Sequence, residues 1–234
     1  MSDATTPLLE VRGIEAGYGA SQVLFGVSLT IEPHQVVSLM GRNGMGKSTT
    51  IKCITGALPV RKGQILFEGR DITNLPADVI ARLGIAIVPE GRQCFPNLTV
   101  REHLVAFARP PAQPQKGALA AQAAPWDLAR IYALFPRLKE REHYMGNQLS
   151  GGEQQMLAIG RALSTNPKLL ILDEATEGLA PVVREEIWRS LARLKFKGQA
   201  ILIIDKYIKS IEKISDLNIL IKLGRNLFEI EYDI

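Results

Sequence analysis

One glycine-rich stretch in the first fifth of the sequence limits the folds open to this chain. Residues 41–48 read Gly-Arg-Asn-Gly-Met-Gly-Lys-Ser, which is the pattern G-x-x-x-x-G-K-[ST]. The apolar segment 36–40 before it predicts a buried strand, and residues 49–54 after it predict the first turns of a helix. This order directs backbone N–H groups and the positive end of the helix dipole toward one point. The pattern therefore predicts a phosphate-binding loop, in which Lys47 meets the β- and γ-phosphates and the Ser48 hydroxyl can bind Mg²⁺.

A second apolar strand is predicted to end in two carboxylates. Residues 169–172 are Leu-Leu-Ile-Leu, and Asp173 and Glu174 follow directly. In a nucleotide site, Asp173 can hold Mg²⁺ through water, and Glu174 can polarise a water molecule for attack on the γ-phosphate. The alternative is an acidic turn that only ends the strand. The phosphate-binding pattern upstream favours the nucleotide site.

A second helix start that suits an anion lies far from the first in sequence. Residues 149–155 read Leu-Ser-Gly-Gly-Glu-Gln-Gln and open a helix that is predicted to run to about Ser164. Ser150 can cap this helix, and the exposed backbone N–H groups of Gly151 and Gly152 can bind an anion. By itself, a serine followed by two glycines is weak evidence, because turns of this composition are common.

Composition and length fit one large domain, or one domain with an insertion. The 234 residues are 46% hydrophobic, which is enough for a sizeable core. The formal net charge of +4 fits a phosphate-binding protein and gives no evidence for nucleic acid. Two cysteines without a C-x-x-C pair imply no disulfide framework and favour a reducing cytosol. Residues 1–7 do not read as a signal peptide, and no apolar run is long enough to predict a membrane span.

The rest of the chain alternates strands and helices after an antiparallel start. This alternation predicts a mostly parallel sheet with helices packed on it. Tyr18, in a glycine-flanked turn, could stack on a purine or could pack as the half-buried end of a strand. The predicted strands are 8–18, 23–31, 63–68, 85–88, 169–172, 200–204, 217–221 and 226–230. The predicted helices are 76–83, 100–108 (capped by Thr99 and Glu102), 126–135 and 181–195, while 136–144 is predicted irregular and 109–125 a mobile connection.

Together the motifs resemble the nucleotide-binding subunits of ABC transporters. Segments 41–48, 149–155 and 169–174 have the order and spacing of the Walker A, signature and Walker B motifs, and other P-loop ATPases lack the signature. The resemblance covers essentially the whole chain and implies an α/β, P-loop (RecA-like) fold. That fold has a mostly parallel sheet, an N-terminal antiparallel β part and an inserted α-helical subdomain. The implied division is one domain over 1–234, with a nucleotide-binding core of 1–98 and 150–234 and a helical subdomain of 99–149.

In finer detail the chain is similar to the bacterial ATPases for branched-chain amino-acid uptake. This likeness implies an ATP-hydrolysing subunit of an importer, with urea or short amides as the next candidate cargo. A different alternative is an ABC ATPase that clamps a macromolecule, although such proteins usually carry two ATPase domains in one chain. A binding-only subunit is a third alternative, which Asp173 and Glu174 argue against and Lys206 weakly favours. The stretches that carry the narrower likeness are 41–44, 87–92, 95–100, 154–161 and 177–181.

The family implies that two such subunits meet head to tail around two ATP molecules. Each ATP would lie on the Walker A motif of one chain and meet the signature motif of the other. Glu174 and Lys47 would be catalytic, with Glu174 as the general base, and Ser48, Asp173 and Glu90 would hold Mg²⁺. The residues implied to bind nucleotide are Tyr18, Gly41, Asn43, Gly44, Gly46, Lys47, Ser48, Thr49, Ser150, Gly151, Gly152, Glu153 and Lys206.

Two positions differ from the usual pattern of the family. Glu90 stands where most members carry glutamine, and the branched-chain amino-acid branch commonly has glutamate there. Lys206 stands where most members carry histidine, and the three histidines of this chain lie elsewhere. A lysine could still touch a γ-phosphate, as a flexible point charge rather than a positioned imidazole.

The family also implies partners and a location. The partners are a second ABC ATPase, either a copy of this chain or a paralogue, and membrane permease subunits, with a periplasmic binding protein acting indirectly. No nucleic acid is implied. A permease helix would enter a groove between the core and the helical subdomain, and closure on ATP would move it. The subunit would be peripheral, on the cytoplasmic face of the inner membrane.

Overall fold

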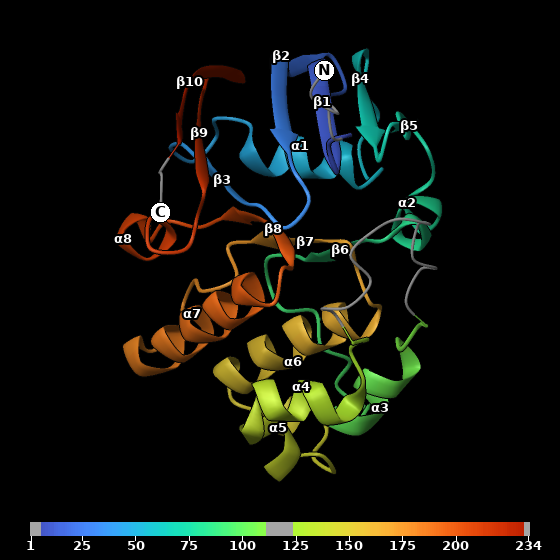
Figure 1. The fold of residues 1–234 in the computed structure, drawn as a ribbon, viewed down its shortest axis with the longest axis vertical. Coiled ribbons are helices and arrows are strands. Elements are labelled where there is room, and N and C mark those ends of the chain that lie inside the picture. Colours follow the sequence, from blue (N-terminus) through green and yellow to red (C-terminus); the bar gives the residue numbers. More distant parts are fainter. Residues whose placement is uncertain (1–5, 111–123, 232–234) are drawn as a thin grey trace, which may run out of the picture.

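Two β-sheets and a group of helices make up the computed structural model, which describes residues 6–110 and 124–231 (Figure 1). The smaller sheet is antiparallel and has the strand order β2-β1-β4-β5. Its strands are β1 (Leu9–Tyr18), β2 (Ser21–Ile31), β4 (Lys62–Phe67) and β5 (Arg70–Asp71). Three of these four strands match the predicted ones, and the antiparallel start of the chain is confirmed.

The larger sheet has six strands in the order β10-β9-β3-β8-β7-β6. Every pair from β9 to β6 is parallel, and β10 alone runs antiparallel to its neighbour. The strands are β3 (Val36–Met40), β6 (Ile85–Val88), β7 (Leu169–Asp173), β8 (Ala200–Ile204), β9 (Leu217–Lys222) and β10 (Arg225–Glu231). The mostly parallel sheet is therefore confirmed as well.

Strand β7, which lies between β8 and β6, shows how the sheet divides the apolar interior into two cores. All five of its residues are buried. Leu169 and Ile171 belong to the core that includes the antiparallel sheet and α1 (Lys47–Ile54). Leu170 and Leu172 point to the opposite face and pack with the helices there. Because both faces are covered, the strand is a continuous apolar run rather than an alternating one.

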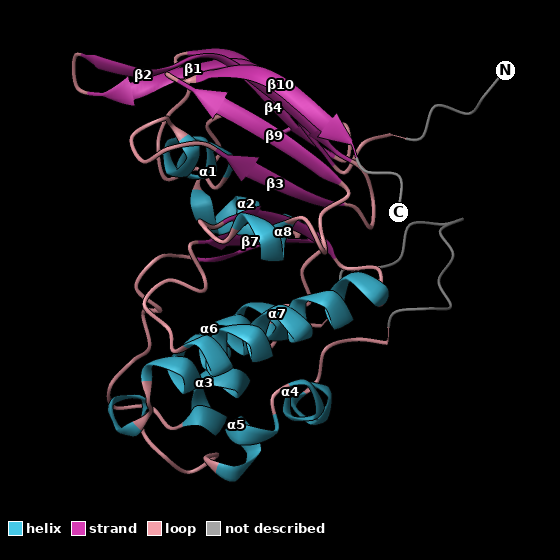
Figure 2. Ribbon diagram, turned by 90° about the vertical axis from the view of Figure 1, so that its left-hand side faces the viewer, coloured by secondary structure: helices cyan, strands magenta, loops and turns pink. Residues whose placement is uncertain are grey.

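The helices occupy both faces of the large sheet, with α6 and α7 below it and α3, α4 and α5 farther away (Figure 2). The capping box predicted for α3 is present, since Thr99 accepts from the Glu102 N–H and Glu102 accepts from the Thr99 N–H. No helix of the described ranges has the length and apolar character needed to cross a membrane. The helices are α2 (Ala77–Leu83), α3 (Val100–Ala106), α4 (Leu128–Leu134), α5 (Pro136–Glu140), α6 (Gly151–Ser164), α7 (Pro181–Phe196) and α8 (Ile208–Ile211), with a 3₁₀ turn η1 (Gly146–Gln148).

The prediction that 136–144 is irregular was wrong for its first half. Pro136 starts α5, where its missing N–H costs nothing and its fixed φ suits the helix. Leu138 anchors this short helix because it is fully buried in the core beneath α6. The short elements β5, η1 and α8 were not predicted. The predicted mobile connection 109–125 lies mostly outside the described residues.

Candidate functional site

The parallel strands bring four of the predicted segments to one edge of the large sheet. The glycine loop follows β3, Glu90 comes two residues after β6, Asp173 ends β7, and Lys206 comes two residues after β8. The carboxyl ends of parallel strands meet at the same edge, which is where ligands bind in open α/β sheets. The residues predicted from separate motifs are thereby gathered around one place.

The glycine loop has a backbone that other residues would not allow. Gly41 has φ 144°, and a Cβ added there would lie 2.3 Å from the carbonyl oxygen of Ile221. Gly46 precedes α1 with φ 103°, and a Cβ there would lie 2.7 Å from Cδ2 of Leu24. Both glycines are needed because the loop curls in a left-handed conformation against neighbouring strands.

Lys47 is folded over this loop. Its ammonium donates to the carbonyl oxygens of Gly41 at 2.7 Å and Arg42 at 3.1 Å, and the residue is only 8% exposed. A cavity of about 380 Å³ opens beside it, a volume in the range of small-ligand sites. The cavity is lined by Tyr18, Val23, Asn43, Gly44, Gly46, Lys47, Ser48, Thr49 and Glu174. A positive charge, a helix N-terminus and loop N–H groups at one cavity fit a polyphosphate.

Tyr18 stands at the rim of this cavity. The residue is 46% exposed, and the Lys52 ammonium donates to its hydroxyl at 3.2 Å while lying 5.3 Å from the ring centroid. An exposed fraction of this size fits stacking on a base, and it also fits the half-buried strand end that was the alternative.

Ser48 and Asp173 form an oxygen pair suited to Mg²⁺. The Ser48 hydroxyl donates to Oδ1 of Asp173 at 3.2 Å. Burial raises the pKa of Asp173, the Ser48 hydrogen bond lowers it, and the charge of Glu90 raises it further. A buried carboxylate beside a hydroxyl offers the hard oxygen donors that Mg²⁺ prefers, and a divalent cation there would offset the cost of burying the charge. These residues therefore fit the ion.

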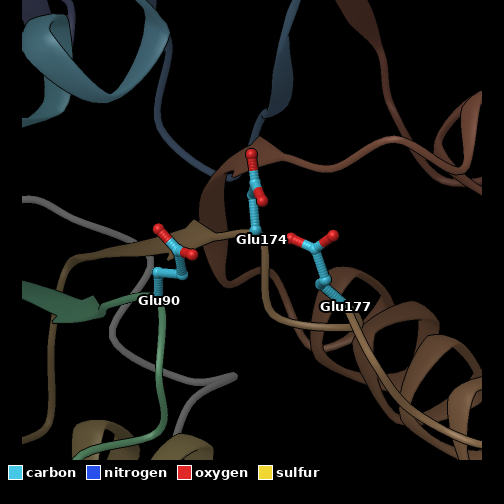
Figure 3. Close-up of side chains that lie close together, drawn as sticks. All are labelled: Glu90, Glu174 and Glu177. Atoms are coloured by element: carbon cyan, nitrogen blue, oxygen red, sulfur yellow. The ribbon is translucent and has the colours of Figure 1, made fainter. Parts of the chain in front are cut away.

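Glu174 lies in a cluster of three carboxylates. Oxygen atoms of Glu90, Glu174 and Glu177 lie within 4.8 Å of one another (Figure 3). The hydrogen bond with Glu177 is the main cause that raises the pKa of Glu174 to about 7, followed by burial and by the charges of Glu177, Glu90 and Asp173. A pKa near 7 is suited to a base that must take and release a proton at neutral pH.

The backbone at Glu174 is itself unusual. Glu174 adopts φ 51°, and its N–H donates to the carbonyl oxygen of Ile204 at 2.8 Å. A left-handed conformation in a residue other than glycine is uncommon and persists only where surrounding contacts hold it. The conformation turns the chain sharply at the end of β7 and directs the carboxylate to the cavity.

Lys206 forms an ion pair with Glu177, a residue to which no chemical role was assigned from the sequence. Its ammonium lies 2.5 Å from Oε1 of Glu177. Hydrogen bonds with Glu174 and then Lys206 lower the pKa of Glu177, and the Glu177 carboxylate raises the pKa of Lys206. The local signal for Glu177 was only its place three residues after Glu174.

The signature residues lie apart from the cavity. Ser150 caps α6: Oε2 of Glu153 accepts from the Ser150 N–H at 2.8 Å and from its hydroxyl at 2.7 Å, so Glu153 is occupied with its own helix. The Arg92 guanidinium covers Gly151, where an added Cβ would meet it at 2.6 Å. None of the described residues that line the cavity comes from α6, and Figure 2 shows α1 and α6 in different layers. Within one chain, the signature residues therefore do not contribute to this cavity.

Comparison with known proteins gives one family. The family described as ABC transporter matches residues 24–177. The high-affinity branched-chain amino acid transport ATP-binding protein BraG of Pseudomonas aeruginosa is 37% identical over 220 residues, which cover 93% of this chain and 90% of that protein. The glutamine transport ATP-binding protein GlnQ of Escherichia coli is 32% identical over 219 residues, 93% and 89% of the two chains.

Solved structures agree with the sequence comparison. The crystal structure of the ADP conformation of an ATP-binding cassette from an ABC transporter is 29% identical in sequence. It has a TM-score of 0.80 to this chain and covers 97% of it, while this chain covers 92% of that one.

Proposed function

We propose that this chain, which belongs to the ABC transporter family and is the ATPase subunit of a transporter, drives an importer of branched-chain amino acids. The resemblance inferred from the motifs is confirmed at the level of the family. The observation that supports branched-chain amino acids as the cargo is the similarity, over nearly the whole chain, to a branched-chain amino acid transport ATP-binding protein. A relative named for glutamine transport has similar coverage, so the cargo has to be tested with the permease.

In this proposal the cavity beside the glycine loop binds ATP as the substrate. The loop N–H groups and Lys47 hold the β- and γ-phosphates, and Tyr18 stacks on the adenine. Glu174 accepts a proton from the water molecule whose oxygen forms a bond to the γ-phosphorus, and ADP leaves with the electron pair of the broken bond. Ser48 and Asp173, with Glu90 nearby, would hold Mg²⁺, which neutralises charge on the phosphate oxygens.

The separation of α6 from the cavity supports a dimer in which each signature motif serves the partner's ATP. The core would comprise 1–98 and 150–234, and the helical subdomain 99–149. A second cavity, of about 420 Å³, is the candidate binding site for a permease segment. Its apolar lining includes Ile87, Phe95 and Phe107. The assembly would lie on the cytoplasmic face of the membrane, with a periplasmic binding protein acting indirectly through the permease.

Steady-state ATP hydrolysis as a function of chain concentration tests the ATPase part of this proposal. Specific activity should rise with concentration, because two chains build each site, and should disappear when Mg²⁺ is chelated. Replacing Glu174 by Gln should lower turnover by roughly 10²–10⁴-fold, the usual scale for loss of a general base, with ATP binding retained. Near-normal turnover in that variant would exclude Glu174 as the base.

The cargo is tested separately, in proteoliposomes that contain the permease encoded with this subunit. Labelled leucine, glutamine and urea should be offered under the same conditions. ATP-dependent uptake of leucine that Glu174→Gln abolishes would support the proposal. Uptake of glutamine or urea in its place would refute the cargo while leaving the ATPase intact.

A further inference from the structure

Two loops that follow neighbouring strands are tied together beside Glu174. The loop after β7 contains Thr176, whose N–H and hydroxyl donate to Oδ2 of Asp205 in the loop after β8, at 3.1 and 2.6 Å. Thr176 is fully buried, and Asp205 is 8% exposed. The ion pair between Glu177 and Lys206 crosses the same two loops at the surface. The buried bonds hold the backbones, so the side chains of the pair meet at a defined place.

The ion pair is too exposed to matter much for stability. Its side chains are 55% and 42% exposed for Lys206 and Glu177, and surface pairs of this kind contribute little to folding. The position of the ion pair beside Glu174 indicates a role in the hydrolytic site instead. The Glu177 carboxylate points toward Glu174, and Glu90 lies on the other side (Figure 3).

Three carboxylates this close together repel one another when they are charged. Within the described residues, the bond to Lys206 is the one salt bridge that any of the three makes. Lys47 of the glycine loop donates instead to two carbonyl oxygens of that loop. Removing the Lys206 ammonium would therefore leave Glu177 with its contact to Glu174 alone, and when both carboxylates are charged, repulsion would move one of the two side chains away.

We propose that Lys206 is a positioning residue of the hydrolytic site, which holds Glu177 and through it keeps the Glu174 carboxylate at the cavity. Lys206 thus acts on the carboxylates and not as a ligand of the γ-phosphate, although the sequence had suggested that contact. This inference rests on the proposed function, because it takes Glu174 as the base. In this inference, Glu177 is the residue that links Lys206 to Glu174.

Charge exchange tests the inference. Lys206→Gln should lower kcat by up to about 10²-fold, the scale for a misplaced catalytic group, while KM for ATP changes less than about twofold. The affinity for a non-hydrolysable ATP analogue with Mg²⁺, measured by calorimetry, should also be unchanged. Lys206→Glu should be at least as slow, and adding Glu177→Lys to it should restore most of the loss. The matched control is Lys209→Gln, which removes the same charge from an exposed position on α8 and should be normal.

Two results would overturn the inference. A Lys206→Gln variant that binds the analogue at least about tenfold more weakly would make Lys206 a phosphate ligand, since the site would then have lost ground-state binding. A reversed pair no faster than Lys206→Glu alone would show that the pair does not act as a unit. Failure of the proposed function would give a different result. The wild-type assembly would then not hydrolyse ATP, or the Glu174→Gln variant would hydrolyse it as fast as wild type.

Discussion

Replacing Glu174 by Gln should stabilise the protein without ligands at alkaline pH and leave it unchanged at acidic pH. The cause is the raised pKa of Glu174, which moves from 4.5 to about 7. The hydrogen bond with Glu177 contributes most to this rise, then burial, then the negative charges of Glu177, Glu90 and Asp173. Glutamine keeps the shape and a hydrogen-bonding group but has no charge to be disfavoured.

The sign follows from the protons bound by each state. Between pH 4.5 and 7 the folded chain holds a proton on Glu174 that the unfolded chain has lost, so the free energy of unfolding falls as pH rises. The stabilising contribution is complete below pH 4.5 and lost above about 7. Glu177, whose pKa is lowered, contributes in the opposite sense and only at more acidic pH, where its stabilisation is lost.

The magnitude is bounded by the size of the pKa change. One unit corresponds to about 1.4 kcal/mol, so the full change could reach about 3 kcal/mol. Glu174 is partly exposed and screened by water, which reduces the expected gain at pH 8 to about 1–2 kcal/mol. For a chain of this length, a gain of that size raises Tm by roughly 2–8 °C.

Urea and thermal unfolding from pH 5 to 8.5, with EDTA and without nucleotide, measure this difference. The matched control is Glu212→Gln, which changes an exposed glutamate outside the site and should give no pH-dependent difference from wild type. A constant difference between wild type and Glu174→Gln across the range would refute a raised pKa. A variant that is less stable at pH 8 would show that the charged carboxylate is favoured by its surroundings.

Three further substitutions test other parts of the structure. Ser150→Arg should block hydrolysis without weakening ATP binding to the isolated chain, with about 1 kcal/mol lost from the helix cap; an equal loss of binding would count against action on the partner's site. Gly46→Ala should cost at least about 1–2 kcal/mol and impair ATP binding, because it adds left-handed strain and a contact with Leu24, and calorimetry with ATP checks this. His103→Leu should cost about 1–3 kcal/mol in urea unfolding, because the buried His103 ring accepts the Phe95 N–H at 2.9 Å, and an unchanged midpoint would contradict this.

The elements that the sequence predicted well are those specified by local patterns. An apolar run before a glycine loop predicts β3 and α1 because both the burial and the turn are encoded within a few residues of each other. The cap at Ser150 predicts the start of α6 at the correct residue for the same reason. Family membership then follows, because the order of these local motifs along the chain is itself diagnostic.

The predictions that failed concern short segments whose local sequence pattern is ambiguous. The segment 136–144 was predicted irregular, but Pro136 begins α5, and the buried Leu138 stabilises this short helix. The four-residue helix α8 has too short a pattern to be recognised from periodicity. In both cases tertiary packing supplies the stabilisation that local propensity does not.

The link from Lys206 to Glu174 could not be predicted because it depends on strand register. Parallel pairing places Asp173 opposite Ile204, so the residues that follow each strand emerge side by side. Glu177 and Lys206, 29 positions apart in sequence, meet only in that register. A slip of one residue would exchange the two faces of the strand and shift the two loops relative to each other, which would separate the pair. The chemistry at this edge is therefore a property of how β7 and β8 pair, and a motif that covers only one of them identifies Glu174 without the residues that hold it.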